Sequence, residues 1–222
     1  MTLARDRVRV VVLISGSGSN LQALIDASKL IDCSYEIVLV ISTRPDAYGL
    51  KRAKDAGIEQ AALDHKAYQD RDSFEMALSE CIDRATPDFI VCAGFMRVFT
   101  EAFVTRYAGR IVNIHPSLLP SFRGLNTYAR ALDAGVAFVG CSVHWVSAGV
   151  DEGAIIGQAI VAVVPGDKPN DLAARVLVQE HLLYPICLNL IASRRAIVRD
   201  GRNFLDGKPG AFALTGHLND AP

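Results

Sequence analysis

Short apolar runs alternate with amphipathic segments along the first half of the chain. Largely β-branched runs cover residues 9–14, 37–42 and 88–93. Runs of this length without polar alternation are typical of strands covered on both faces, as in a parallel sheet. The intervening stretches 46–57 and 72–84 place apolar residues at helical spacing. This order predicts right-handed strand–helix–strand units and a parallel sheet.

The second half of the chain has a different pattern of apolar and polar residues. Its pattern predicts a short strand at 111–114, a helix at 127–135 and two longer strands at 140–146 and 154–164. A polar, glycine-containing loop at 147–153 separates the two longer strands. We therefore expect a hairpin-like excursion at this loop.

A long helix is expected near the end of the chain. Asn170 and Asp171 are typical helix-capping residues, and the helical pattern continues to about Ile191. Pro185 falls inside it, where a missing N–H and a ring clash predict a kink or a break. The tail from Gly201 onward is rich in turn-forming residues.

These elements predict an α/β fold class: a doubly wound, mostly parallel twisted sheet with an N-terminal Rossmann-like mononucleotide-binding half. The sequence shows no repeat, no low-complexity segment and no clear linker. We therefore expect a single domain over residues 1–222, made of halves that meet at about residue 108.

Composition and charge narrow the function classes. The chain is 50% hydrophobic and 21% charged, which is enough apolar material for a core, and its net charge is −1 without a Lys/Arg cluster. We therefore expect no nucleic-acid partner. The five cysteines are scattered and form no C-x-x-C pair, which favours free thiols in a reducing cytosol over disulfides or zinc. No signal peptide or membrane-length apolar run is present, so we expect a cytoplasmic protein without a membrane partner.

A glycine-containing loop follows the first predicted strand. Small residues at 15–20 would let backbone amides and a helix N-terminus approach an anion. Leu21 stands where a dinucleotide fingerprint has its third glycine, and no Lys-Ser/Thr pair follows as in a P-loop. A phosphate monoester is therefore the expected ligand, although a tight turn without a ligand fits the same pattern.

Two polar side chains alternate at the end of a predicted strand. Asn113 and His115 point to one side, where an amide and an imidazole could both donate to a developing oxyanion. Asp151, in the later loop, would raise the pKa of His115 and favour the imidazolium. Taken singly, His115 fits a structural histidine and Asp151 fits a surface turn acid. We interpret His144, beside Trp145, as structural.

The chemistry that these residues suggest is direct transfer. No serine or cysteine stands in an obvious nucleophile motif, so a covalent enzyme intermediate is not expected.

Five segments in this order and spacing resemble the phosphoribosylglycinamide formyltransferases, which belong to the folate-dependent formyltransferases. The resemblance runs from Val10 to about Ile191. Its most specific parts are Ile14-Ser15-Gly16-Ser17-Gly18-Ser19-Asn20-Leu21-Gln22, Ala93-Gly94-Phe95-Met96-Arg97, Asn113-Ile114-His115-Pro116-Ser117-Leu118-Leu119-Pro120, Val150-Asp151-Glu152-Gly153 and Gln179-Glu180-His181.

The resemblance implies an enzyme that transfers the formyl group of 10-formyltetrahydrofolate to the amino group of glycinamide ribonucleotide in purine (IMP) biosynthesis. Asn113 and His115 would stabilise the oxyanion, with His115 as proton donor. Asp151 would keep His115 protonated and help to move the proton from the amine. The half before about residue 108 would bind phosphate, and residues 109–222 would be catalytic and bind folate.

The resemblance also implies binding residues. The ribonucleotide would contact Gly18, Ser19, Asn20, Gln179 and Glu180. The folate would contact Arg71, Met96, Arg97, Val98, Phe99, Asn113, Ser147, Ala148, Gly149, Val150 and Asp151. The co-substrate is 10-formyltetrahydrofolate, no metal is expected, and the partners are small molecules bound by a monomer or a homodimer.

The loop after Pro120 departs from the pattern. Many relatives carry proline where Arg123 stands and histidine where Asn126 stands. An Arg-Gly pair here also occurs in methionyl-tRNA formyltransferases, which would be expected to add a C-terminal barrel and a basic surface. A 10-formyltetrahydrofolate hydrolase is the main alternative, although it usually carries an extra N-terminal regulatory domain and needs no phosphate loop. A non-enzymatic nucleotide-binding module would leave Asn113, His115 and Asp151 unexplained.

Overall fold

The computed structural model describes residues 7–215. The chain forms two compact units, residues 1–112 and 113–222. Each unit has strands and helices of its own, and the second also carries a small C-terminal sheet.

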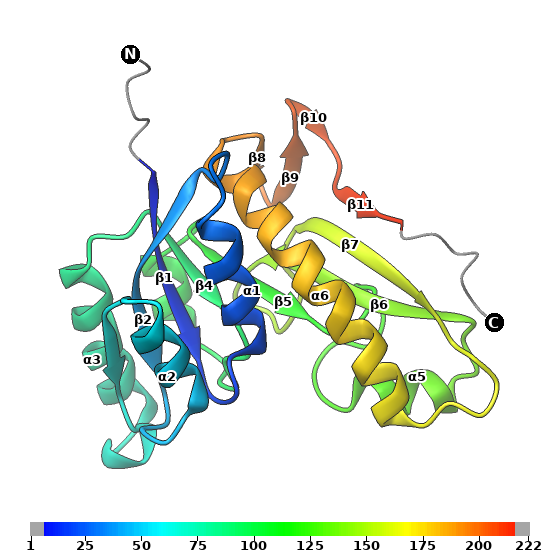
Figure 1. The fold of residues 1–222 in the computed structure, drawn as a ribbon, viewed down its shortest axis with the longest axis horizontal. Coiled ribbons are helices and arrows are strands. Elements are labelled where there is room, and N and C mark those ends of the chain that lie inside the picture. Colours follow the sequence, from blue (N-terminus) through cyan, green and yellow to red (C-terminus); the bar gives the residue numbers. More distant parts are fainter. Residues whose placement is uncertain (1–6, 216–222) are drawn as a thin grey trace. The chain divides into compact units, whose positions relative to one another are not determined.

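The first unit contains a parallel sheet with the strand order β4-β1-β2-β3. These strands are β1 (Val8–Ile14), β2 (Tyr35–Ser42), β3 (Gln60–Ala62) and β4 (Phe89–Cys92). All three pairings are parallel. In this sheet β1 lies between β2 and β4 (Figure 1). Its apolar side chains from Val10 onward are fully buried, as the continuous hydrophobic run predicts. The expected parallel sheet is therefore confirmed.

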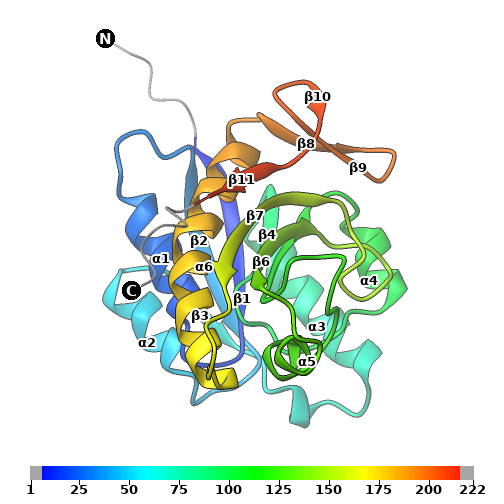
Figure 2. The same cartoon turned by 90° about the vertical axis from the view of Figure 1, so that its right-hand side faces the viewer.

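The helices of this unit cover both faces of its sheet. They are α1 (Ser19–Ser28), α2 (Tyr48–Asp55), α3 (Arg71–Arg84) and the short α4 (Glu101–Arg106), with a 3₁₀ turn at His65–Ala67. Figure 2 shows α1 and α2 on one face and α3 on the opposite face. The sequence pattern did not predict β3 or α4, because each is too short to carry a clear hydrophobic period.

The second unit contains a mixed run of strands in the order β11-β7-β6-β5. These are β5 (Ile111–His115), which begins just before the boundary, β6 (Phe138–Trp145), β7 (Ile155–Ala162) and β11 (Phe212–Leu214). β6 and β7 pair antiparallel, which confirms the expected hairpin-like excursion, and β11 is parallel to β7. The fold is therefore α/β with a mixed, mostly parallel sheet.

Two helices accompany these strands, α5 (Thr127–Asp133) and α6 (Pro169–Ala192). α6 packs on β6 and β7. Its N-cap is Lys168, so the expected cap at Asn170 is wrong, whereas Asp171 does cap the helix by accepting from the Lys168 N–H at 2.8 Å. The expected break at Pro185 is also wrong, because the helix continues through it. Burial of the flanking side chains, such as Leu183 and Leu188, outweighs the single lost hydrogen bond.

The tail is more regular than expected. It forms an antiparallel sheet of β8 (Ala196–Arg199), β9 (Arg202–Leu205) and β10 (Lys208–Pro209). Asp200-Gly201 and Asp206-Gly207 have positive φ angles and make the tight turns between these strands. Asp-Gly pairs of this kind are a strong hairpin signal. The prediction of turns was correct, but it missed the strands between them.

Two further expectations concern cysteines and membranes. All five cysteines are free thiols, and burial raises the pKa of Cys92, Cys141 and Cys187. Within residues 7–215, no helix combines the length and apolar character needed to cross a membrane.

Candidate active site

Four polar side chains of the second unit meet at the ends of β5 and β6. His115 Nδ1 lies 3.2 Å from Asp151 Oδ2. His144 Nε2 lies 3.2 Å from Asn113 Nδ2 and 3.6 Å from Asp151 Oδ1. The structure thus brings the three predicted catalytic residues together and adds a fourth.

The loop between β6 and β7 places Asp151 beside the strand ends. Asp151 adopts a positive φ of 53°. The base of the loop is closed by a 2.9 Å hydrogen bond from Trp145 N–H to the Ala154 carbonyl. A Cβ on Gly153 would lie 1.6 Å from the Trp145 carbonyl oxygen, so only glycine fits there without displacing the loop.

Backbone groups of the loop after β5 complete the cluster. His115 Nε2 donates to the Phe122 carbonyl at 3.0 Å. Gly124 N–H donates to Asp151 Oδ2 at 2.9 Å. Both oxygens that face the His115 ring, from Phe122 and Asp151, are acceptors, so the ring is held in one orientation. Sequence analysis missed these contacts because backbone groups carry no residue signal.

His144 orients Asn113. Its Nδ1 lies 2.9 Å from the Trp145 carbonyl, which can only accept, so the proton sits on Nδ1. Nε2 then accepts from Asn113 Nδ2, which fixes the amide and leaves its second N–H available. The sequence predicts a structural role for His144 and does not place it beside Asn113 and Asp151, where the structure puts it. Its place at the end of β6, directly before the loop that carries Asp151, was the signal that could have revealed it.

The protonation of His115 differs from the expectation. Burial lowers the pKa of His115 below its ordinary value, and the Phe122 carbonyl and the Asp151 carboxylate only partly oppose this. Burial alone would raise the pKa of Asp151, but the neighbouring His144 side chain, the hydrogen bond from Gly124 N–H and the proximity of His115 lower it overall. The net shift in the pKa of His115 is therefore downward, opposite to the expected rise, although the Asp151 carboxylate acts in the expected direction.

This shift predicts a pH-dependent stability. Because the folded-state pKa of His115 lies below its ordinary value of 6.5, the unfolded chain binds the proton more readily. The contribution of His115 to the free energy of unfolding is therefore complete above pH 6.5 and is lost as the pH falls below it. We expect the urea midpoint of the wild type to fall more steeply below that pH than the midpoint of His115→Gln. Parallel curves for the two proteins would contradict the lowered pKa.

The loop after β1 in the first unit is shaped for close backbone approach. Gly18 has φ 69° and is the N-cap of α1, where it has no side chain to bond the first amides. A Cβ at Gly18 would lie 2.7 Å from Gly49 Cα, so a larger residue does not fit. Ser19 and Asn20 form the first turn of α1. The loop thus ends at a helix N-terminus whose amides are not capped by Gly18.

Two residues of α6 in the second unit were also predicted to bind the ribonucleotide. Glu180 is buried, with 7% of its surface exposed. The Oε1 atom of Gln179 is buried and has no hydrogen-bond partner among residues 7–215. A buried acceptor without a partner is costly, which is the kind of group that a bound donor would satisfy.

The predicted folate residues of the first unit lie around the segment after β4. Met96 is 77% exposed and Val98 is 52% exposed. Phe99 stacks on Phe95 and Phe103 with centroids 4.9 Å and 4.5 Å away. Arg97 lies 5.2 Å from the Phe74 ring centroid. An aromatic stack thus supports a segment that exposes apolar side chains.

The remaining predicted folate residues fall in two places. Arg71 is the exposed first residue of α3. Ser147, Ala148, Gly149 and Val150 share the loop of Asp151 in the second unit, where Val150 is 48% exposed.

Comparison with known proteins identifies the family. A family model described as formyl transferase matches residues 8–188. The chain belongs to the formyl transferase family. A relative in this family, the phosphoribosylglycinamide formyltransferase of Escherichia coli K12, is 45% identical over 201 residues, which cover 90% of this chain and 95% of the relative.

Solved structures of family members agree with this fold. A phosphoribosylglycinamide formyltransferase from Coxiella burnetii superposes with a TM-score of 0.89 and 46% identity, covering 94% of this chain and 100% of the other. Glycinamide ribonucleotide transformylase 1 from Symbiobacterium toebii gives a TM-score of 0.86 and 44% identity, covering 90% of this chain and 94% of the other. These similarities cover both compact units.

Proposed function

We propose that the chain is a phosphoribosylglycinamide formyltransferase (EC 2.1.2.2). It transfers the formyl group of 10-formyltetrahydrofolate to the amino group of 5-phosphoribosylglycinamide in purine biosynthesis. The cluster of Asn113, His115 and Asp151 in a chain 45% identical to the Escherichia coli enzyme carries this proposal.

Asn113 and His115 act on the formyl oxygen. As the amine attacks the formyl carbon, a carbon–nitrogen bond forms and the oxygen becomes negative. The free N–H of Asn113 donates to this oxyanion. The same negative charge raises the pKa of the buried His115, so the imidazole becomes a better proton acceptor at the moment when charge develops.

Asp151 completes the proton transfer. Its carboxylate lies 3.2 Å from His115 Nδ1 and stabilises the imidazolium as it forms. The proton lost by the amine is taken up by the His115–Asp151 pair. It is then given to the folate nitrogen as the bond between that nitrogen and the formyl carbon breaks. Atoms and charges balance, and the enzyme returns to its starting protonation.

The phosphate of the ribonucleotide is assigned to Gly18, Ser19 and Asn20. The geometry of Gly18 exposes the first amides of α1, and the partial positive charge of a helix N-terminus favours an anion. The ribose is assigned to Gln179 and Glu180. The carboxylate of Glu180 would accept hydrogen bonds from the ribose hydroxyls, and the buried Oε1 of Gln179 could accept a further one.

The folate is assigned to two surfaces. The exposed side chains of Met96 and Val98 offer apolar contact, and Arg71 and Arg97 offer positive charge to the acidic folate tail. Phe99 supports this segment. Asn113, the loop residues from Ser147 to Val150 and Asp151 face the reacting end of the folate. A pterin ring suits such a mixture of apolar and backbone polar contacts.

The biological setting follows from this reaction. The co-substrate is 10-formyltetrahydrofolate, the partners are small molecules, and the working form is a monomer or a homodimer. A purine-pathway enzyme of this kind acts in the cytoplasm.

The transfer is tested by folate release. The enzyme is given 10-formyltetrahydrofolate with and without glycinamide ribonucleotide, and formation of tetrahydrofolate is followed. We expect release only when the ribonucleotide is present. Equal release without it would overturn the transferase and favour a 10-formyltetrahydrofolate hydrolase.

Glu180 provides a test of the ribose assignment. Loss of a charge-assisted hydrogen bond should raise the KM for the ribonucleotide in Glu180→Gln by roughly 10- to 100-fold, with little change in kcat. Glu80→Gln, at an exposed helix position, is the control and should leave both constants unchanged. A lower kcat at unchanged KM would assign Glu180 to the chemical step instead.

A further inference from the structure

Trp145 occupies the junction between the catalytic strand and the catalytic loop. It is the last residue of β6 and follows His144 directly. Its carbonyl accepts from His144 Nδ1 at 2.9 Å, and its N–H donates to the Ala154 carbonyl at 2.9 Å. Any shift of the Trp145 backbone therefore moves both His144 and the base of the loop that carries Asp151.

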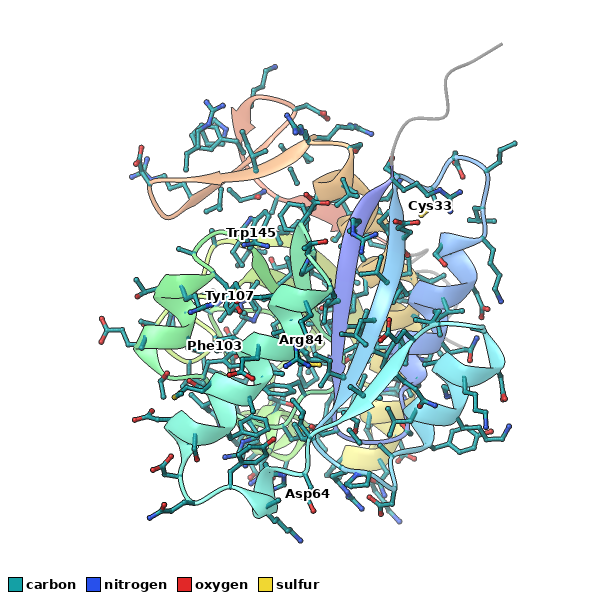
Figure 3. All side chains as sticks on the ribbon, turned by 90° about the vertical axis from the view of Figure 1, so that its left-hand side faces the viewer. Cys33, Asp64, Arg84, Phe103, Tyr107 and Trp145 are labelled. Carbon is teal, nitrogen blue, oxygen red and sulfur yellow. The ribbon has the colours of Figure 1, made fainter. Side chains whose placement is uncertain are left out.

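The Trp145 side chain is tied to the small C-terminal sheet. Its Nε1 donates to Asn203 Oδ1 at 3.0 Å, and both residues are buried. Asn203 lies on β9 and in turn donates from Nδ2 to the Gly210 carbonyl at 2.6 Å. In Figure 3, Trp145 lies next to the orange strands of this sheet. One asparagine thus connects the loop base to two segments of the tail.

A hollow lies beside this junction. It has a volume of about 470 Å³, and residues 151–155 of the loop and residues 201–203 and 209–211 of the tail are among those that line it. The Trp145–Asn203 hydrogen bond is a specific link between the loop base and the tail next to this hollow.

We propose that Trp145 and Asn203 are positioning residues, through which the C-terminal sheet sets the position of His144 and Asp151. The inference rests on the function proposed for this site. It assigns a role in the reaction to a part of the chain that does not touch the reacting atoms. A displacement of about 1 Å at a catalytic group can cost on the order of 10²-fold in rate, so one hydrogen bond at this junction is enough to matter.

Two variants remove the link from opposite sides. Trp145→Phe keeps an aromatic ring and deletes the N–H, whereas Asn203→Leu keeps the approximate shape and deletes the acceptor. We expect each to lower kcat by about 5- to 50-fold with little change in either KM, and to shift the pH profile of kcat. The double variant should be no worse than the more damaged single variant, because both remove the same Trp145–Asn203 hydrogen bond.

A control separates positioning from general stability. Arg195 and Asp206 form an exposed ion pair beside the same sheet, with Arg195 Nε 2.8 Å from Asp206 Oδ1, and neither takes part in the Trp145–Asn203 hydrogen bond. Asp206→Asn should leave kcat and the pH profile unchanged. All variants are compared at the same folded fraction, set from their urea curves. An Asn203→Leu enzyme that is less stable but has the wild-type kcat and pH profile would overturn the proposal.

Fluorescence gives a readout that needs no substrate. Trp145 is the only tryptophan in the chain, so the emission reports on this junction alone. Asn203→Leu should shift the emission maximum, whereas Asp206→Asn should not, and an unshifted Asn203→Leu spectrum would count against the link.

A wild type that transfers no formyl group would refute the proposed function itself. An active wild type with an equally active Asn203→Leu would refute only the positioning role.

Discussion

Replacing His115 with alanine should lower kcat by about 10²- to 10³-fold, the usual effect of losing one group that stabilises developing charge in the transition state. The variant also loses the group that takes up the proton of the amine, so the upper end of this range is expected. The KM for the ribonucleotide should change little, because His115 belongs to the chemical step. Single-turnover measurements with saturating substrates would report the change directly.

His65→Ala is the matched control for this prediction. His65 is a partly buried histidine of the first unit, with its Nδ1 3.2 Å from the Thr43 carbonyl. Its loss should leave kcat unchanged. If His115→Ala instead kept its kcat and only raised KM, the imidazole would be a binding group and the proposed chemistry would be wrong.

Asp151→Asn should be the second large loss, about 10²-fold or more in kcat, because a neutral amide cannot stabilise the imidazolium. The substitution keeps the size of the side chain and an acceptor for Gly124 N–H. The loop should therefore stay in place, and loss of charge is the main change. Combined with His115→Ala, the effects should not add, since the two residues act as one proton-transfer pair.

The neighbouring Glu152 gives a close control. Its Oε1 pairs with Arg123 Nη1 at 2.7 Å on the exposed side of the same loop. Exposed pairs of this kind contribute about 0–1 kcal/mol, so Glu152→Gln should retain nearly full activity. Equal losses in Asp151→Asn and Glu152→Gln would show that the loop responds to any lost charge, and Asp151 would have no special role.

The features predicted best from the sequence were those marked by a regular pattern of apolar and polar residues. Fully apolar runs such as 9–14 identified the buried strands, and the polar break at 147–153 identified the antiparallel pair. The alternation of Asn113 and His115, together with the resemblance to the formyltransferases, nominated the polar cluster with Asp151 that the structure shows. These features can be predicted from the sequence because residue type alone sets the tendency to be buried and the capacity to form hydrogen bonds.

What the sequence missed depends on geometry that residue type does not encode. The Phe122 carbonyl and the Gly124 N–H enter the site as backbone groups, so the identity of these residues does not predict the contacts. The sign of the shift in the pKa of His115 depends on how deeply the ring is buried relative to its distance from Asp151. The Trp145–Asn203 bond joins residues that lie 58 positions apart. Such long-range pairings become visible only in the folded chain.

The loop that carries Asp151 has a base that tolerates little change and a tip that can accept substitutions. Its base is closed by the Trp145–Ala154 hydrogen bond and by the close fit of Gly153, whereas Ala148 and Val150 are exposed at its tip. Substitutions at the tip change the surface offered to a ligand without moving the carboxylate. Under the folate assignment proposed above, natural divergence or a directed-evolution library at these two positions would alter which folate analogues and inhibitors the site accepts and leave the proposed chemistry unchanged.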